Sequence, residues 1–173
     1  MRIELANLEG GRGDFEKAYQ PAELDLDDER VKLCGPTSIS GKIRQAATEV
    51  FIDGHVDTCA QVDCDRCLKP LKIPVSVDFG LEYISGVDYE ENRNLSLTED
   101  EMSVSVFDGE TIDVDEVAKE QILLAVPSRS LCTENCKGFC PTCGANRNDG
   151  DCGCEEKEID PRWAALKNLV DGK

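Results

Sequence analysis

The sequence predicts an α+β fold: a twisted, partly closed antiparallel β-sheet covered by a helix, with a cysteine-rich zinc-binding tail and a C-terminal helix. Three observations lead to this prediction. Residues 31–84 alternate in polarity and are rich in β-branched residues, with turn residues between the runs, as in antiparallel strands. Residues 113–126 carry a helical apolar pattern with a cap before it and a proline after it. Residues 131–154 hold six of the ten cysteines and almost no apolar side chains.

Length and composition set the frame for function. The 173 residues suit one domain with a small appendage, and we expect a body at 1–127 and a cysteine-rich segment with a final helix at 128–173. Acidic residues outnumber basic ones 36 to 19, a formal charge of −17, so most of the surface should repel a nucleic-acid backbone. The single histidine, His55, leaves little for acid–base catalysis by histidine, and we expect it to be a surface or satisfied residue rather than a catalyst.

The strands are expected at 2–8, 31–33, 38–46, 49–62 and 71–84. Between the first two, residues 10–13 should form a loop and the acidic run 23–29 a solvated loop or strand edge. Gly54 indicates a bulge or bend inside its strand. Prolines 70 and 74 place the last strand at an edge of the sheet or near its own start.

Cys64 and Cys67 form a C-x2-C pair in the turn at 63–70. The pair could supply two ligands to a shared metal site, remain as free thiols, or act as a redox dithiol. A redox dithiol needs a helix N-terminus to lower its thiol pKa, and a β-turn is predicted here, so metal ligation is favoured. Cys34 and Cys59 stand alone in strand-like segments and are expected to pack as small apolar residues.

Residues 86–111 are the longest acidic run, predicted as an exposed loop with one short strand at 102–107. This loop is either a docking surface for a basic partner or a solvated linker. The helix that follows should be capped by Asp113, with Glu116 completing a capping box, and should end before Pro127. A second helix is expected from Asp160-Pro161 to about residue 170, either docked on the body or presented to a partner.

The cysteine-rich segment is too polar and too rich in glycine to be ordered by packing. Disulfides or a metal must therefore fix it. The Cys-Pro-Thr-Cys-Gly sequence at 140–144 is typical of structural zinc sites, since both sulfurs of the turn can face one ion. The N-terminal residues lack an export signal, and no stretch is long and apolar enough for a membrane, so we expect a cytoplasmic protein. Thiols are kept reduced in the cytoplasm. This favours zinc over disulfides, and we also rank zinc above an iron–sulfur cluster or a redox dithiol.

Six cysteines exceed one tetrahedral site, so one zinc ion is expected and two remain an alternative. In one arrangement the last two pairs share an ion and the first pair joins the hairpin cysteines at a second ion. In another, four of the first five bind one ion, leaving Cys154 and the hairpin pair as thiols. The candidate ligands are Cys64, Cys67, Cys132, Cys136, Cys140, Cys143, Cys152 and Cys154.

Four motifs in order resemble the YceD family of large ribosomal RNA subunit accumulation proteins. They are Cys-Asp-Arg-Cys-Leu at 64–68, Ile-Asp at 112–113 with Glu-Gln-Ile-Leu-Leu-Ala-Val-Pro at 120–127, the cysteine motif at 136–146 and Asp-Pro-Arg at 160–162. The resemblance spans about residues 31–170 and implies a non-catalytic role in large-subunit rRNA accumulation and ribosome assembly. Members differ in whether they carry the C-terminal cysteines, so this role cannot depend on a metal alone.

Two functional hypotheses follow. The first is an assembly factor that binds a ribosomal protein or another basic protein, with contact to rRNA indirect. The second is a thiol-redox protein or zinc switch that uses Cys64 and Cys67. Direct recognition of RNA by the tail is disfavoured, because the only basic residues near it are Arg129, Lys137 and Arg147.

Overall fold

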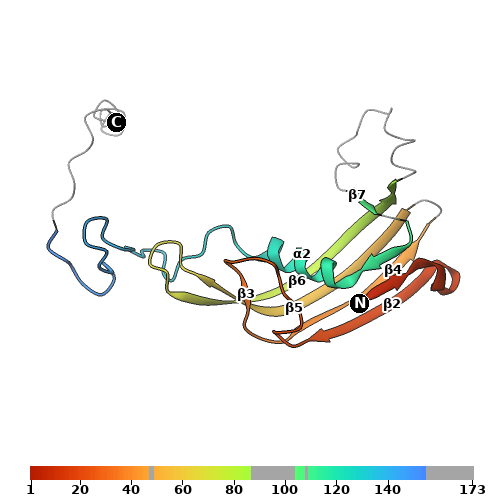
Figure 1. Cartoon of the computed structure of the whole chain (residues 1–173), viewed down its shortest axis with the longest axis horizontal. Coiled ribbons are helices and arrows are strands. Elements are labelled where there is room, and N and C mark those ends of the chain that lie inside the picture. Colours follow the sequence, from red (N-terminus) through yellow and green to blue (C-terminus); the bar gives the residue numbers. More distant parts are fainter. Residues whose placement is uncertain (47–48, 87–103, 108, 155–173) are drawn as a thin grey trace, which may run out of the picture. The chain divides into compact units, whose positions relative to one another are not determined.

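The computed structural model describes residues 1–46, 49–86, 104–107 and 109–154. The chain divides into two compact units, Met1–Cys132 and Thr133–Lys173. The first unit is built on one large β-sheet (Figure 1), and the described part of the second consists of turns around its cysteines.

Six strands form the large sheet. Their path is β2 (Arg12–Tyr19), β4 (Thr37–Gln45), β5 (Glu49–Asp63), β6 (Pro70–Ser85) and β7 (Val104–Phe107), and β3 (Lys32–Leu33) pairs with β5 off this path. Every pairing is antiparallel except that of β6 with β7. In the part of the chain that the structure describes, the path is open, with β2 and β7 at its ends.

A second, two-stranded sheet joins the N-terminus to the helix. Strand β1 (Arg2–Glu4) pairs antiparallel with β8 (Thr111–Asp113), and the short 3-10 turns η1 (Leu5–Asn7) and η2 (Glu9–Gly11) lead from β1 into β2. Helix α2 (Val114–Ala125) follows β8 directly. The Asp113 carboxylate caps it by accepting a hydrogen bond from the Asp115 backbone N–H at 3.0 Å.

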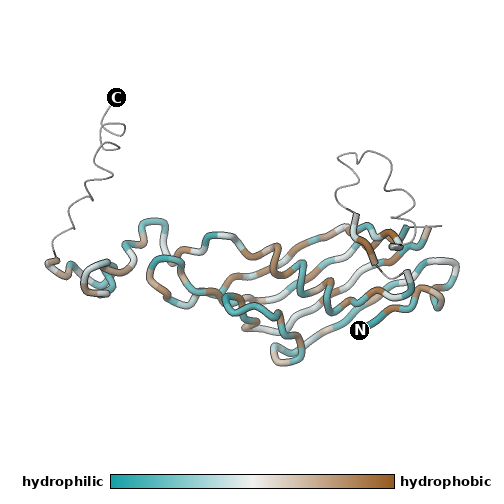
Figure 2. The backbone as a smooth tube through the Cα atoms, turned by 45° about the horizontal axis from the view of Figure 1, so that its top comes forward, coloured by the Kyte–Doolittle hydropathy of each residue, from teal (hydrophilic) through white to brown (hydrophobic). Residues whose placement is uncertain are grey.

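The core lies on one face of the large sheet. Hydropathy alternates along the strands (Figure 2), because successive side chains in a strand point to opposite faces. Helix α2 packs against β5 and β6 and adds Val117, Ala118 and Ile122 to the same apolar cluster. Strand β5 contributes its even-numbered residues, Val50, Ile52, Val56, Ala60 and Val62.

A pair of glycines lies opposite one another at the centre of this sheet. Gly41 on β4 lies opposite Gly54 on β5. On their other sides, Gly41 lies opposite the buried Phe15 on β2, and Gly54 lies opposite the buried Phe79 on β6. A Cβ atom on Gly54 would lie 2.5 Å from Cζ of Phe79. The register runs through Gly54 without a break, so the predicted bulge is wrong and the glycine makes room for a ring.

The large strands and the turn at 63–70 match the sequence-based prediction closely, and the twisted sheet is supported. Three N-terminal details differ. The first strand is shorter than 2–8, because the chain turns into 3-10 geometry at Leu5. Strand β2 was not predicted at all, since Gly13 and Lys17 on its inward face and Ala18 on its outward face obscure the alternation. The acidic run 23–29 is a loop, one of its two predicted forms, but it is not fully solvated, because Leu24 and Leu26 are buried.

The helix prediction is confirmed in its start and its end. Glu116 does not complete the expected capping box; its carboxylate instead accepts a hydrogen bond from Lys119 Nζ at 3.2 Å. Leu124, an apolar residue within the helical pattern at 113–126, is nevertheless 72% exposed. The short strand expected at 102–107 is β7, whereas most of the acidic run 86–111 and the C-terminal helix lie outside the described residues. That α2 covers a whole face of the sheet stays a prediction.

Candidate metal centres

The turn between β5 and β6 brings Cys64 and Cys67 together. The Cys64 backbone N–H donates to the Lys69 carbonyl and the Leu68 N–H donates to the Cys64 carbonyl, both at 2.9 Å. Leu68 takes a left-handed conformation, φ 55°, which closes the turn in so few residues. Both thiols are buried although the turn lies at the end of a hairpin.

A third thiol reaches this turn from the segment after α2. Two hydrogen bonds between Asp65 and Ser130 clamp this segment to the turn. The Asp65 N–H donates to the Ser130 carbonyl at 2.9 Å, and the Ser130 N–H donates to Asp65 Oδ2 at 2.6 Å. This clamp places Cys132 so that its backbone N–H points to Cys64 Sγ at 3.4 Å and its Sγ lies 3.6 Å from Cys67 Sγ. The chain therefore gathers three sulfurs from residues far apart in sequence.

Two sets of four cysteines have the spacing of a metal site. The hairpin cluster is Cys64, Cys67, Cys132 and Cys136, and the tail cluster is Cys140, Cys143, Cys152 and Cys154. Within each set all four Sγ atoms lie within 4.8 Å of one another. Four sulfurs at about 2.3 Å from a tetrahedral zinc ion are about 3.8 Å apart, so small movements would bring either set into zinc geometry.

Backbone turns build the tail cluster inside the second unit. The Cys140 N–H donates to the Ala145 carbonyl at 2.8 Å, and the Gly144 N–H donates back to the Cys140 carbonyl at 2.9 Å. Gly144 and Gly153 have φ values of 73° and 69°, a region that favours glycine. Each glycine follows a cysteine of the cluster, so the turns direct the sulfurs to a common point.

Hydrogen bonds tune the thiols of both clusters. Burial raises the pKa of Cys64, but N–H groups of Arg66, Cys132 and Cys67 outweigh it and lower the value to about 6. The pKa of Cys140 falls to about 6, chiefly through the N–H groups of Cys143 and Thr142. Such N–H donors favour the thiolate, which is the form that binds metal.

One sulfur contact was not anticipated from the sequence. The Asn148 side-chain amide donates to Cys136 Sγ at 3.3 Å, while its Oδ1 accepts the Lys137 backbone N–H at 2.8 Å. Asn146 Oδ1 holds the same amide at 2.8 Å. The signal in the sequence is the Asn-Arg-Asn-Asp-Gly run, whose short polar side chains favour hydrogen bonds to nearby backbone.

The eight cysteines predicted as ligands all lie in these two clusters, and the two clusters can each hold a metal ion. The donor sets suit a soft or borderline cation such as zinc, because they consist of thiols alone. That zinc binds there, and through which four sulfurs at each site, stays a prediction.

The prediction for Cys34 and Cys59 is wrong. The two residues form a disulfide with Cα atoms 5.3 Å apart, and the Cys34 backbone N–H donates to the Cys59 carbonyl at 2.8 Å. The register of β3 against β5 explains the pairing, because Leu33 lies opposite Ala60 and so brings Cys34 beside Cys59. Their separation of 25 residues hides this proximity in the sequence.

His55 stands on the exposed face of β5 between two carboxylates. Its Nδ1 lies 2.6 Å from Asp78 Oδ1 and its Nε2 lies 2.7 Å from Asp57 Oδ2. Ser76 Oγ is 3.3 Å from the same Nε2, which gives the outline of a Ser-His-Asp triad. However, Asp57 is nearer to Nε2 and also accepts a hydrogen bond from Ser76, so the histidine is not positioned to take the serine proton. The arrangement provides no activated nucleophile.

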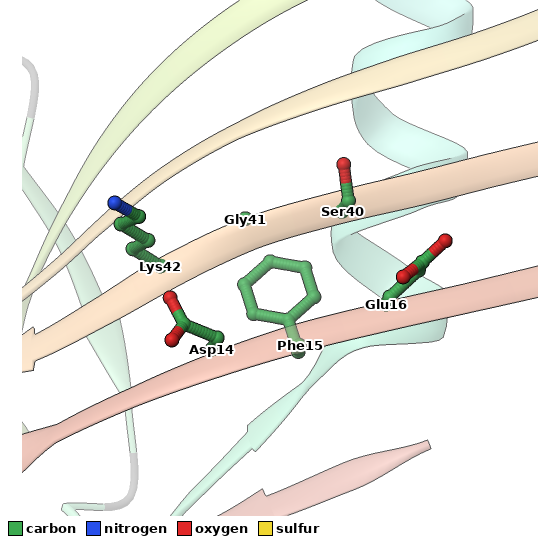
Figure 3. Close-up of a pocket in the computed structure, with 6 residues that line it drawn as sticks. All are labelled: Asp14, Phe15, Glu16, Ser40, Gly41 and Lys42. Atoms are coloured by element: carbon green, nitrogen blue, oxygen red, sulfur yellow. The ribbon is translucent and has the colours of Figure 1, made fainter.

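A shallow hollow of about 420 Å³ lies between β2 and β4 (Figure 3). Its lining mixes opposite charges with an aromatic ring, and it contains no cysteine or histidine. It therefore offers no recognisable chemistry of its own. The lining residues are Asp14, Phe15, Glu16, Ser40, Gly41 and Lys42.

Fold and clusters together define a small α+β protein with two sets of thiols that can hold metal. Among the described residues, no helix has both the length and the apolar character needed for a membrane crossing. The family model of the large ribosomal RNA subunit accumulation protein YceD matches residues 52–170, more than half of the chain. The chain belongs to this family.

Relatives support the assignment at low identity. An uncharacterized protein of Mycobacterium tuberculosis (strain H37Rv) is 25% identical, over 98% of this chain and 81% of its own length. YlbN of Bacillus subtilis is 24% identical, over 91% of this chain and 87% of its own. The chloroplastic large ribosomal RNA subunit accumulation protein YCED homolog 1 of Zea mays is 24% identical, over 78% of this chain and 54% of its own. No solved structure matches the chain.

Proposed function

We propose that this protein is a non-catalytic factor that supports large-subunit rRNA accumulation and ribosome assembly by binding another macromolecule in the cytoplasm. The observation that carries this proposal is the family match, which includes most of β5, the hairpin cysteines and α2. The charge of −17 favours a basic protein, such as a ribosomal protein, over direct contact with rRNA.

Deletion of the gene tests this role. We expect large-subunit rRNA to fall relative to small-subunit rRNA, and the wild-type gene to restore the ratio. Quantification of both rRNAs and of ribosomal particles on a sucrose gradient is the measurement. An unchanged ratio under all growth conditions would reject the role.

We further propose that both clusters bind zinc as structural sites. Each offers four thiols and no open position for a substrate, which is the pattern of structural rather than catalytic zinc. Elemental analysis of the purified full chain should give about two zinc ions per molecule. Replacing Cys140 and Cys143 with serine should leave about one, because the hairpin cluster keeps its own thiols, and a wild-type ratio near zero would discard both sites.

A thiol-redox or zinc-switch role for Cys64 and Cys67 is the second candidate. The lowered pKa of Cys64 favours it. Against it, both sulfurs are buried. Replacing both cysteines with serine should abolish a redox function at once, whereas an assembly factor should lose rRNA accumulation only as far as folding or zinc binding fails.

A further inference from the structure

A groove of about 470 Å³ runs between helix α2 and the acidic segment 23–29. Leucine side chains from both elements form its apolar part, and charged side chains from both form its rim. All of these residues belong to the first unit. The lining residues are Leu26, Asp27, Glu116, Lys119, Glu120, Leu123 and Leu124.

The rim is acidic. Three of its residues carry carboxylates and one carries an ammonium group, so its net charge is −2. Lys119 is already engaged: its Nζ lies 3.0 Å from Asp27 Oδ2 and 3.2 Å from Glu116 Oε1. Both carboxylates remain largely exposed, at 75% and 70% of their side chains. These carboxylates can therefore bind further cationic side chains in addition to Lys119.

Leu124 is the unusual feature of this groove. It is 72% exposed on a helix whose other large apolar residues are buried or partly buried. A leucine in this state adds little to folding, because little of its surface leaves water. Together with Leu123 and the buried Leu26, which line the same groove, it supplies the apolar anchor that a helix-in-groove contact uses.

We propose that this groove binds a basic amphipathic helix of a partner protein, with the partner's apolar face on Leu123 and Leu124 and its lysines or arginines on Asp27, Glu116 and Glu120. The acidic rim selects a basic partner and repels nucleic acid, and the apolar floor requires large aliphatic side chains rather than charge alone. This inference rests on the proposed function and names the kind of partner that the assembly role needs.

Peptide binding to the full chain tests the groove. The probe is a fluorescent synthetic helix with leucines at positions i, i+3, i+4 and i+7 and lysines between them. Its control has the same composition with the leucines spread around the helix. We expect the Leu124→Gln variant to bind the probe about tenfold more weakly than the wild type by anisotropy, since one anchor is lost. Its urea midpoint should stay unchanged.

Charge reversals separate the groove from the general acidity of the chain. Glu120→Lys should weaken probe binding about three- to tenfold, and the loss should shrink at high salt. Glu16→Lys, the same charge change on β2, should have little effect. Equal binding of the two peptides, or equal effects of the two reversals, would overturn the proposal.

Two further results would also remove it. A sedimentation coefficient that rises with protein concentration, and stops rising in Leu124→Gln, would assign the groove to a second copy of the chain. Loss of large-subunit rRNA on gene deletion, combined with wild-type peptide binding by Leu124→Gln, would reject this surface and leave the proposed function standing.

Discussion

At the scale of single residues, the disulfide between Cys34 and Cys59 contradicts the expectation that all ten thiols are reduced. The expectation came from the compartment, since disulfides are rare in the cytosol. The pairing itself comes from strand register, which a lone cysteine in a strand-like run does not reveal. The spacing of a C-x2-C pair, by contrast, predicts a turn that brings its two sulfurs together. For this reason the sequence indicated the clustered cysteines but not the disulfide.

The disulfide should stabilise the first unit under oxidising conditions. Closing a loop of 25 residues corresponds to about 3.5 kcal/mol by the chain-entropy model. We expect the double variant Cys34→Ala/Cys59→Ala to lose about 2–4 kcal/mol of unfolding free energy in urea titrations. A phosphine reductant should bring the wild type close to the variant. A variant as stable as the oxidised wild type would contradict the bond's contribution.

His55 should titrate above its usual range. The hydrogen bond to Asp78 raises its pKa, desolvation opposes the rise, and Asp57 adds to it. Because the folded pKa exceeds the unfolded value of 6.5, the stabilisation is complete below pH 6.5 and is lost as the pH rises through the folded pKa.

As the chain has one histidine, its ring resonances in an NMR titration report this pKa without ambiguity. Asp78→Asn should lower the pKa, while Asp63→Asn, away from the ring on β5, should leave it in place. A wild-type pKa at or below 6.5 would show that the two carboxylates do not hold the ring in solution.

At the scale of elements, the absence of a side chain at Gly54 allows β5 to pack closely against the ring of Phe79. A methyl group there would also approach the Ser40 carbonyl oxygen to 2.8 Å, and backbone cannot move aside easily. We expect Gly54→Ala to cost roughly 1–3 kcal/mol of unfolding free energy. Gly80→Ala is the matched control on β6, because its nearest contact would be an ordinary 3.5 Å to the Asp53 side chain. Equal urea midpoints for the two variants would contradict this packing.

The long strands, the hairpin turn and the start and end of α2 were predictable because local pattern and burial agree there. Strand β2 and the two-stranded sheet of β1 with β8 were not. Strand β8 is only three residues long and merges into the helix cap, so its pairing with residues 2–4 depends on tertiary contact alone. The exposure of Leu124 was also not predictable, because leucine is a residue type that suits burial. Only the structure shows that it lines a groove.

At the scale of the whole molecule, the two units should respond differently to loss of metal. The first unit has an apolar core of its own, whereas in the described part of the second unit only Cys136, Gly138 and Cys140 are buried. On the proposal that zinc fills the clusters, its removal with a chelator should therefore leave the far-UV β-sheet signal of the first unit largely intact. It should expose Lys137 and Arg147 to trypsin, while Lys42 and Arg44 in β4 stay protected.

Mass spectrometry of the tryptic fragments is the measurement, and re-addition of zinc is its control. Cleavage after Lys137 at the same rate with and without the chelator would mean that metal does not order this segment.

The hairpin cluster also bears on the order of events while the chain is being made. Cys132 follows Cys67 by 65 residues, so the ribosome releases the whole β5–β6 hairpin and helix α2 before the third sulfur emerges. Any ion that binds there is therefore captured late in synthesis, after the sheet has had the chance to form. Such an ion would stabilise a body that has already folded and would not nucleate its folding.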